Sequence, residues 1–484
     1  MLNSNNKIIV TPSGITIHPY RRYKSKELER ATSIKLPNRA RQEVTGFFLK
    51  DEDTFVTHPM SLNLLASYFP SHIIERKEPN ASVFIGRDLD ECNFELTPKQ
   101  MSIIQDICTL NHNRIFMCLP TGFGKTILAI YLTVMIHKTK ALVLCPSATV
   151  LDQWKVKYSD MGNIPEDKIL HLTKSTEIEA ILNGTKKVDD VYIVVCTQAL
   201  LNSFAKSHSW YDLNDFAEKL GIGLIFVDEA HKNVGGTIRI LGFMSVRRVY
   251  YLSADFNQAD KARRYKFAKV FAGVPLVRPD DSQMEELRHL TCNLIKFNSR
   301  PTQLELSHVY GKFGFKLNSY SKYELEKGVL YDLLIRILKI IFNTLKPGRK
   351  IIIMTSSIKG VDDYTYYLRG EFPTRKIKRF HSEVLPDEKK EIYDDGTEII
   401  VTTYMSLGYG LDLKGVQHVI SLDLVNEMWD NQAAGRARPI PNENCYYYLF
   451  ADMGFRKTSE TLNQRLNYMR RANVAEIRQF DYTE

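Results

Sequence analysis

The chain has 484 residues, of which 44% are hydrophobic and 25% are charged, and it carries a net charge of +9. This composition excludes a disordered or fibrous protein, and the length exceeds what one hydrophobic core usually serves, so we expect about three domains. The excess of basic residues is modest, and it favours a polyanionic partner only weakly.

Residues 1–93 are interpreted as a small α+β accessory domain. Apolar segments at 7–11 and 15–17 surround Pro12-Ser13-Gly14, and segments at 46–49 and 54–57 surround a charged turn. Strand-forming residues on both sides of turn residues are typical of β-hairpins. The sequence therefore predicts two hairpins in this domain.

The same region is basic, because residues 1–50 contain ten Lys or Arg against three acidic residues. Most of the excess comes from Arg21, Arg22, Lys24, Lys26, Arg30, Lys35, Arg39 and Arg41, with Tyr20 and Tyr23 among them. Such a segment is able to contact phosphates and stack on bases. A charge run is also common on a solvated surface, and the sequence leaves both interpretations open.

A phosphate-binding loop is predicted at residues 119–126. An apolar strand-like run at 114–118 precedes it and a helix-length apolar segment at 127–136 follows, which is the context that such a loop requires. Glycine lets backbone N–H groups turn toward phosphate oxygens; we expect Lys125 to reach the β- and γ-phosphates of a nucleoside triphosphate and Thr126 to bind Mg²⁺. The predicted nucleotide contacts are Pro120, Thr121, Gly122, Phe123, Gly124, Lys125 and Thr126.

Two adjacent carboxylates follow the apolar run at 224–227. Asp228 and Glu229 end this predicted strand, and Ala230 and His231 come next. In a phosphate-loop ATPase the first carboxylate holds Mg²⁺ and the second polarises the attacking water. We therefore expect Asp228 to be a metal ligand and Glu229 to be the catalytic base.

These two motifs, with further segments in the same order, resemble those of the superfamily 2 helicases and translocases along residues 94–450. The other matching segments are Leu96–Gln100, Ala141–Ser147 continuing to Trp154, Ile193–Gln198, Ser253–Asp255, Ile351–Met354, Val401–Thr403 with Gly410–Asp412, and Gln432–Arg438. Short apolar strands also alternate with helix-length segments, which independently predicts parallel sheets covered on both faces. Helices are expected at 98–110, 125–138, 149–160, 210–219 and 331–341.

The resemblance implies an α/β fold with two tandem RecA-like parallel-sheet domains, at residues 94–285 and 286–452, beside the N-terminal α+β accessory domain. It implies ATP and Mg²⁺ as cofactors and DNA or RNA as a partner. The implied nucleotide contacts beyond the phosphate loop are Gln100 for adenine, with Gly410, Asp412 and Gln432 in the second domain. The implied coupling residues are His231, Ser253 and Asp255, and the implied nucleic-acid contacts are Pro146, Ser147, Thr197 and Thr402.

Two positions depart from the family pattern. Asp255 stands where the family usually has threonine, and an ionised acid has no hydroxyl hydrogen to donate. Arg438 follows Arg436 by two residues instead of three, and Pro439 takes the expected place. Both arginines are therefore candidates for the arginine finger, the cation that contacts the γ-phosphate.

The end of the chain, residues 453–484, is expected to form a helical tail, with the helix running from Arg456 to Phe480. It contains Arg465, Arg470, Arg471 and Arg478. These residues are able to touch nucleic acid, but packing on the second domain is the interpretation that we favour.

We therefore expect an ATP-dependent helicase or translocase that acts on nucleic acid, with an RNA polymerase or replication machinery as a further candidate partner. The closest resemblance is to poxvirus transcript-release and phage recombination helicases with a DEAH motif, and the composition also suits the helicase of a yeast cytoplasmic linear plasmid. The alternatives are a nucleic-acid- or polymerase-binding factor with a weakened ATPase and a motor subunit of a restriction-type complex. Without a secretory signal, a membrane-length apolar run or paired cysteine spacings, we expect a cytoplasmic protein without a membrane partner.

Overall fold

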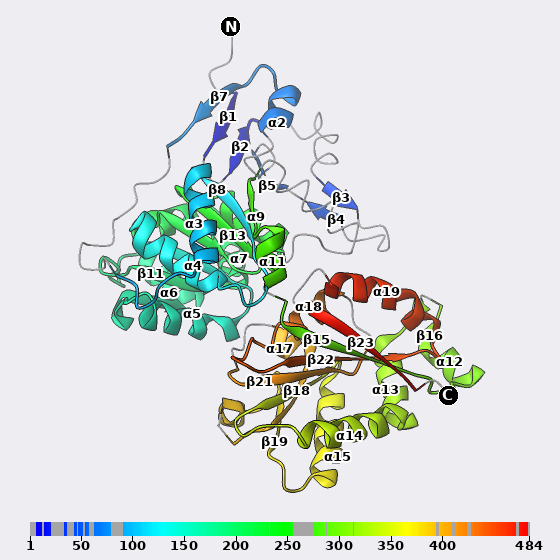
Figure 1. The fold of residues 1–484 in the computed structure, drawn as a ribbon. Helices are drawn as coiled ribbons and strands as arrows, with labels where there is room; N and C mark the ends of the chain where they lie inside the picture. Colours follow the sequence, from blue (N-terminus) through cyan, green and yellow to red (C-terminus); the bar gives the residue numbers. More distant parts are fainter. Residues whose placement is uncertain are drawn as a thin grey trace. The chain divides into compact units, whose positions relative to one another are not determined.

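The computed structural model describes residues 6–11, 14–20, 33–35, 43–45, 47–51, 54–57, 62–78, 91–231, 233–254, 274–286, 288–312, 314–393, 396–408, 413–423, 427–470 and 474–482. The chain divides into two compact units, Met1–Pro279 and Asp280–Glu484. Figure 1 shows a small sheet and a large helix-covered sheet in the first unit, and another large helix-covered sheet in the second.

The N-terminal part of the first unit is a five-stranded sheet, in the order β5-β6-β2-β1-β7. Its elements are β1 (Lys7–Val10), β2 (Ile15–His18), β5 (Phe47–Asp51), β6 (Thr54–Thr57), α2 (Leu62–Tyr68) and β7 (Ile73–Arg76), beside the separate pair β3 (Ser33–Lys35) and β4 (Glu43–Thr45). Strands β1 and β2 pair antiparallel, as do β5 and β6, so both predicted hairpins are confirmed. Tyr20 is fully buried and stacks on Phe55 with ring centroids 4.8 Å apart, so it is a core residue and is not available to stack on bases.

The rest of the first unit is a seven-stranded parallel sheet, in the order β10-β11-β9-β12-β13-β8-β14. Its strands are β8 (Arg114–Cys118), β9 (Ala141–Cys145), β10 (Ile169–Leu172), β11 (Ile193–Thr197), β12 (Leu224–Val227), β13 (Arg248–Ser253) and β14 (Leu276–Val277). Its helices are α3 (Pro98–Leu110), α4 (Lys125–Tyr131), the π-helix η3 (Leu132–His137), α5 (Ala148–Asp160), η4 (Glu166–Lys168), α6 (Ser175–Leu182), α7 (Gln198–Ser207), α8 (Asp212–Leu220) and α9 (Val234–Leu241).

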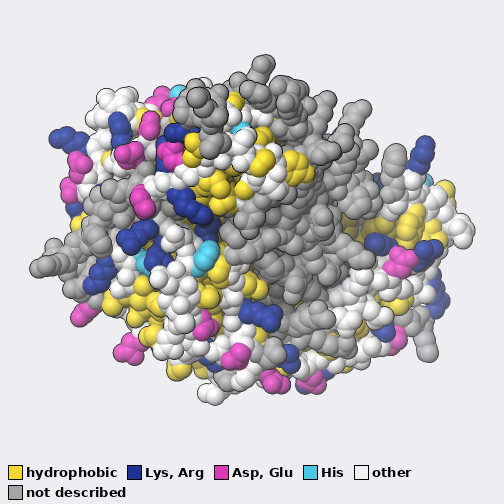
Figure 2. Space-filling view, turned by 90° about the horizontal axis from the view of Figure 1, so that it is seen from above, with side chains coloured by type: hydrophobic (Ala, Val, Ile, Leu, Met, Phe, Trp, Pro, Cys, Tyr) yellow, Lys and Arg dark blue, Asp and Glu magenta, His cyan; other side chains and the backbone are white. Residues whose placement is uncertain are grey.

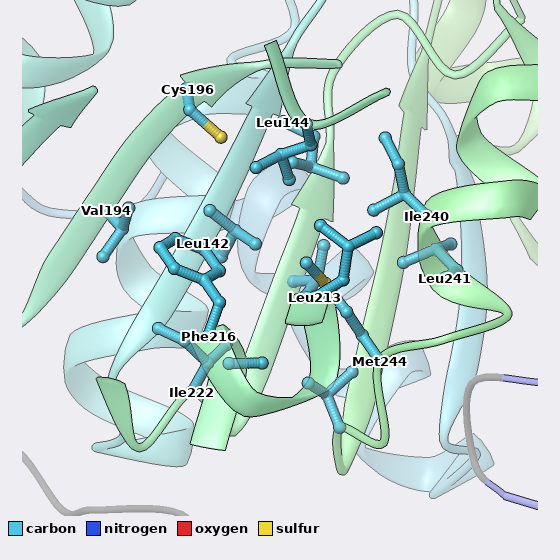
Figure 3. Packing of buried hydrophobic residues seen from close by; sticks show 14 of the residues in the cluster. Leu142, Leu144, Val194, Cys196, Leu213, Phe216, Ile222, Ile240, Leu241 and Met244 are labelled. Carbon is cyan, nitrogen blue, oxygen red and sulfur yellow. The ribbon is translucent and has the colours of Figure 1, made fainter. Parts of the chain in front are cut away.

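Apolar side chains from the strands and helices of this sheet form one continuous core. Figure 3 shows Leu142 and Leu144 of β9 in the same layer as Leu213 and Phe216 of α8. Val56 of β6 belongs to the same cluster, so the N-terminal sheet packs onto this domain through shared apolar surface. The central strands β9 and β12 are buried along their whole length, as strands of a parallel sheet covered on both faces require.

The second unit is built on another seven-stranded parallel sheet, in the order β19-β20-β18-β21-β22-β15-β23. Its strands are β15 (Leu290–Phe297), β18 (Lys350–Thr355), β19 (Ile377–Phe380), β20 (Ile399–Thr403), β21 (Val416–Ser421), β22 (Cys445–Asp452) and β23 (Val474–Tyr482), with a small pair β16 (Tyr310–Gly311) and β17 (Gly314–Phe315). Its helices are α11 (Asp281–Glu286), α12 (Gln303–Val309), α13 (Leu317–Lys327), α14 (Val329–Phe342), α15 (Ile358–Glu371), α16 (Pro386–Lys390), η5 (Glu391–Tyr393), α17 (Tyr404–Gly408), α18 (Glu427–Ala434) and α19 (Arg456–Arg470).

Alternate residues of β18 serve two different cores. Ile352 and Met354 join α18 and α19 on one face, while Ile351 and Ile353 join α14 and α15 on the other. Successive side chains of a strand point to opposite faces, so this division places helices on both sides of the sheet. The expected pair of RecA-like parallel-sheet domains is therefore confirmed.

The expectation of a helix from Arg456 to Phe480 was wrong for its last part, from Val474 onward. Helix α19 spans Arg456–Arg470, and Val474–Tyr482 forms strand β23, which runs parallel to β15 at the edge of the sheet. The segment contains Val474, Ile477, Phe480 and Tyr482, which are strand-favouring residue types. The tail is thus part of the second sheet, and the buried side chain of Arg465 supports the packing interpretation.

Candidate nucleotide-binding and catalytic site

The phosphate loop lies between β8 and α4, as a strand-loop-helix unit requires. Gly124 adopts φ 101°, a conformation that side chains disfavour, and a Cβ built there would lie 2.5 Å from Gln100 Nε2. Lys125, the first residue of α4, donates from Nζ to the Leu119 carbonyl oxygen at 3.3 Å. The lysine therefore lies against its own loop, at the place where the sequence predicts a contact with phosphate.

Gln100 supports the loop from α3. Its Nε2 donates to the Phe123 carbonyl at 2.9 Å, while its Oε1 accepts from the Thr97 N–H at 3.0 Å. Thr97 returns the contact by accepting from the Gln100 N–H at 3.3 Å, which completes a capping box at the helix start. One glutamine thus joins the start of α3 to the phosphate loop.

The two predicted carboxylates follow β12, which is separated from β8 in the sheet by β13 alone. Asp228 Oδ1 accepts from the Glu229 N–H at 2.9 Å, and Asp228 N–H donates to the Leu144 carbonyl at 3.0 Å. Glu229 adopts φ 46°, a left-handed conformation that costs on the order of 1–2 kcal/mol for a residue with a side chain. Strain of this kind concentrates at functional sites because the surrounding structure has to hold it.

His231 and Ser253 meet at the carboxyl ends of β12 and β13. His231 Nδ1 lies 2.8 Å from Ser253 Oγ and 3.2 Å from Glu229 Oε2, and the His231 and Ser253 side chains are both buried. The Ser253 carbonyl also accepts from the Leu119 N–H at 2.9 Å. His231 and Ser253, two of the three predicted coupling residues, therefore connect the second carboxylate to the start of the phosphate loop.

Trp154 is a site residue whose role the sequence analysis did not identify. Its indole Nε1 donates to Asp228 Oδ2 at 3.0 Å, and its side chain is only 3% exposed. Tryptophan carries one N–H that needs a partner when buried, and α5 follows β9, the neighbour of β12 in the sheet. The buried tryptophan and the expected neighbouring strands were the sequence signals for this bond. The bond itself joins residues 74 positions apart in the chain.

The donor set fits Mg²⁺ bound together with a nucleotide. Among the residues that the structure describes, no three His, Cys, Asp or Glu side chains gather as a metal site. Mg²⁺ needs no such cluster when substrate phosphates supply ligands, and one carboxylate with one hydroxyl then suffices. Asp228 and Thr126 are the residues that would provide these two groups.

The predicted nucleic-acid contacts differ in their surroundings. Pro146 and Ser147 lie between β9 and α5, and Thr197 ends the adjacent strand β11, so all three are at one edge of the first sheet. Thr197 Oγ1 accepts from the Leu200 N–H at 3.1 Å and caps α7. Thr402, in β20 of the second unit, is fully buried, which leaves its side chain no surface for such a contact.

In the second unit, Gln432 lies buried in α18, and the two candidate finger arginines follow the helix end. The Arg436 N–H donates to the Ala433 carbonyl at 2.9 Å, and the Arg438 carbonyl accepts from Cys445 Sγ at 3.2 Å. Arg436 and Arg438 are both half-buried, and their backbones are held by different partners. Asp255, Gly410 and Asp412, together with most of the basic N-terminal segment, lie outside the described residues.

Helix α18 is fixed by a buried ion pair. Asp430 accepts from Arg465 Nη2 of α19 at 2.8 Å and from the Tyr447 hydroxyl of β22 at 2.7 Å. Burial alone lowers the pKa of Arg465, but the Asp430 carboxylate outweighs this effect, and the pKa is raised. The motif with Gln432, Arg436 and Arg438 is thereby anchored to the C-terminal helix.

Two family models match the chain. Residues 93–258 match the model described as "Type III restriction enzyme, res subunit", and residues 330–439 match "Helicase conserved C-terminal domain". Among solved structures, the chain is similar to "S. cerevisiae Dbp5 bound to RNA and ADP BeF3", with a TM-score of 0.54, 16% identity and coverage of 80% of this chain and 90% of that one. At this identity the likeness concerns the fold alone.

Curated relatives match at low identity. The chain is 26% identical over 180 residues to "Transcript termination protein A18" of Myxoma virus (strain Lausanne), covering 34% of each chain. It is 30% identical over 173 residues to "General transcription and DNA repair factor IIH helicase/translocase subunit XPB" of Encephalitozoon cuniculi (strain GB-M1), covering 36% of this chain and 22% of that protein. The chain thus matches about a third of the viral protein's length and about a fifth of the other's.

Proposed function

We propose that this chain, which its two matched regions make a superfamily 2 helicase, uses ATP hydrolysis to move along nucleic acid or to unwind nucleic acid. The observation that carries this proposal is the phosphate loop, braced by Gln100 at 2.9 Å, on the same parallel sheet as the Asp228-Glu229 pair. Ligands of α/β sheets bind at the carboxyl ends of the strands, where both motifs lie.

Each residue then has a distinct task. Lys125 offsets charge on the β- and γ-phosphates, and Glu229 orients the water that attacks the γ-phosphate. Mg²⁺, held by Asp228 and Thr126 together with the phosphates, supplies further positive charge to the transferred group. Arg436 and Arg438 of the second unit are proposed to add the arginine-finger charge.

Nucleic acid is proposed to bind through its backbone at the edge formed by Pro146, Ser147 and Thr197. Contacts to phosphates tolerate any base sequence, which suits a motor that moves along its track. On the face shown in Figure 2, basic and acidic side chains are interspersed over the described surface. The proposal therefore rests more on the residues at this edge than on the net charge of the chain.

Transcription is the biological setting that we propose, with an RNA polymerase as the candidate partner. The support comes from the names of two relatives, the transcript termination protein of Myxoma virus and the general transcription and DNA repair factor subunit of Encephalitozoon cuniculi. The name of the model matched by residues 93–258 favours a motor subunit of a restriction-type complex as the second candidate. A place on a yeast cytoplasmic linear plasmid stays a prediction, as do a cytoplasmic location and the choice between DNA and RNA. No helix in the described ranges is long and apolar enough to cross a membrane.

The test is ATP turnover with and without single-stranded DNA or RNA at low salt. We expect stimulation by nucleic acid that weakens as salt rises, because phosphate contacts release counterions. Lys125→Ala and Glu229→Gln are each expected to abolish turnover, while Glu229→Gln still binds ATP. Wild-type hydrolysis in either variant contradicts the assignment, and an ATPase that neither nucleic acid stimulates favours the binding factor with a weakened ATPase.

A further inference from the structure

Helix α5 contacts the catalytic site at two points. It begins at Ala148, directly after the Pro146-Ser147 turn, and its second turn presents Trp154 to Asp228. Because Trp154 Nε1 donates at 3.0 Å to Oδ2, while the Glu229 N–H occupies Oδ1, the orientation of the Asp228 carboxylate is defined from both sides.

The second contact joins α5 to the helix of the phosphate loop. Tyr158 lies one turn after Trp154, with ring centroids 5.9 Å apart, and it is fully buried. The Tyr158 hydroxyl lies 3.0 Å from Thr133 Oγ1, and Thr133 also donates to the Ala129 carbonyl at 2.8 Å. Thr133 belongs to the π-helix η3, which continues α4. Any displacement of α5 therefore acts on Asp228 and on the phosphate-loop helix together.

We propose that Trp154 is a positioning residue, which orients Asp228 for Mg²⁺ and transmits occupancy of the Pro146-Ser147 turn by nucleic acid to that carboxylate. The transmission rests on the proposed function, whereas the orientation of Asp228 does not. Groups that hydrogen-bond to metal ligands fix ligand direction, and their loss typically weakens metal affinity about 10- to 100-fold. The indole of Trp154 provides such a bond to Asp228.

The first experiment measures metal binding without turnover. Mn²⁺, as a spectroscopic substitute for Mg²⁺, is titrated into the full chain with saturating ADP and followed by electron paramagnetic resonance. We expect Trp154→Phe, which keeps an aromatic ring but lacks the N–H, to weaken Mn²⁺ binding by about tenfold or more. Affinity within twofold of wild type overturns the proposal.

A matched control and an isosteric variant separate positioning from packing. Trp210 stacks on Phe243 with centroids 5.5 Å apart in the apolar core of the same unit, so Trp210→Phe is expected to leave Mn²⁺ affinity unchanged. Replacement of Trp154 by benzothienylalanine exchanges only the N–H for sulfur. If Trp154→Phe lowers the melting temperature, the benzothienylalanine variant decides between the two roles. Weakened Mn²⁺ binding in that variant at a wild-type melting temperature supports the proposal. Wild-type Mn²⁺ affinity in that variant overturns it.

The second experiment tests transmission by comparing basal with nucleic-acid-stimulated ATPase rates at saturating Mg²⁺. We expect Trp154→Phe to bind oligo(dT) or oligo(U) like wild type but to lose at least about tenfold of the stimulation ratio, because the link to the metal ligand is broken. An unchanged ratio overturns the transmission. If wild type itself shows no stimulation, the transmission fails with the proposed function, while the Mn²⁺ measurement still decides the role of Trp154 toward Asp228.

Discussion

At the scale of single residues, the predicted site includes positions where the backbone conformation and the neighbouring atoms allow only one residue type. Gly124 is the clearest, because its φ is +101° and the space beyond its Cα is filled by the Gln100 amide. Gly184 has a comparable φ of +78° but nothing within 4 Å of an added Cβ. A substitution at Gly184 therefore introduces backbone strain without crowding, and it serves as the control for Gly124.

Gly124→Ala is expected to weaken binding of a fluorescent ATP analogue at least about tenfold, since strain and displacement of Gln100 each cost on the order of 1–3 kcal/mol. Gly184→Ala carries only the strain and is expected to bind the analogue normally. Equal affinities for Gly124→Ala and wild type, in an equilibrium titration, would contradict the bracing role of Gln100.

Glu324 is a buried acid in α13 of the second unit. Burial, followed by the nearby negative charge of Asp452, raises the pKa of Glu324 well above its usual 4.5. The folded state therefore keeps this proton at pH values where the unfolded state has lost it. The resulting contribution to stability is full below pH 4.5 and is lost as the pH rises through the folded pKa.

Glu324→Gln preserves the shape without a titrating proton. Its melting temperature is expected to exceed that of wild type by a margin that grows from pH 5 to pH 8, following about 1.4 kcal/mol per pH unit where only the folded state is protonated. The exposed Glu326→Gln on the same helix should show no such trend. Parallel melting curves for Glu324→Gln and wild type across this range would exclude a buried neutral carboxyl group.

At the scale of secondary-structure elements, the ends of helices fix the site. Helix α18 positions Gln432 and the two arginines, and its Asp430 is held by Arg465 of α19. Arg465→Met leaves the Asp430 charge buried without its cation, and removal of one partner from such a pair costs about 3–5 kcal/mol. We expect a marked fall in unfolding free energy, measured by denaturant titration.

Arg456→Met provides the control on the same helix. Arg456 forms an exposed pair with Glu460, and its side chain is 87% exposed, so the change is expected to be nearly neutral. If the two variants lost equal stability, α19 as a whole, instead of the buried ion pair, would be the source of the effect.

Much of the element structure was predictable because its causes are local. The Thr97-Pro98 start of α3, the apolar runs of the sheets and the glycines of the phosphate loop are all visible in neighbouring residues. Strand β23 was missed although it contains strand-favouring residues, since its partner β15 precedes it by more than 170 positions and its apolar residues do not alternate regularly. The bond between Trp154 and Asp228 escaped for the same reason, because only the neighbouring strands β9 and β12 bring them together.

At the scale of the whole molecule, the predicted functions are divided between the two units. Every residue of the phosphate loop and both carboxylates belong to Met1–Pro279, whereas Arg436 and Arg438 belong to Asp280–Glu484. Nucleotide binding and nucleotide turnover should therefore be separable by mutation.

Arg436→Ala and Arg438→Ala are each expected to keep ATP binding while losing stimulated turnover, on the order of a thousandfold for an arginine finger. Rates of ATP hydrolysis and equilibrium binding, measured on the same preparations, check this. Normal turnover in Arg438→Ala would leave Arg436 as the finger and make the displaced arginine structural.

The strand order of the second sheet also sets the order in which this sheet can be completed during synthesis. Strand β15 lies between β22 and β23, so both of its neighbours follow it in the sequence. At translation rates of about 5–20 residues per second, β15 emerges on the order of ten seconds before the first of them. Its backbone N–H and C=O groups have no native strand partner during that interval. The apolar run from Leu290 to Phe297 is consequently a segment that needs protection by the ribosome or a chaperone while the protein is being made.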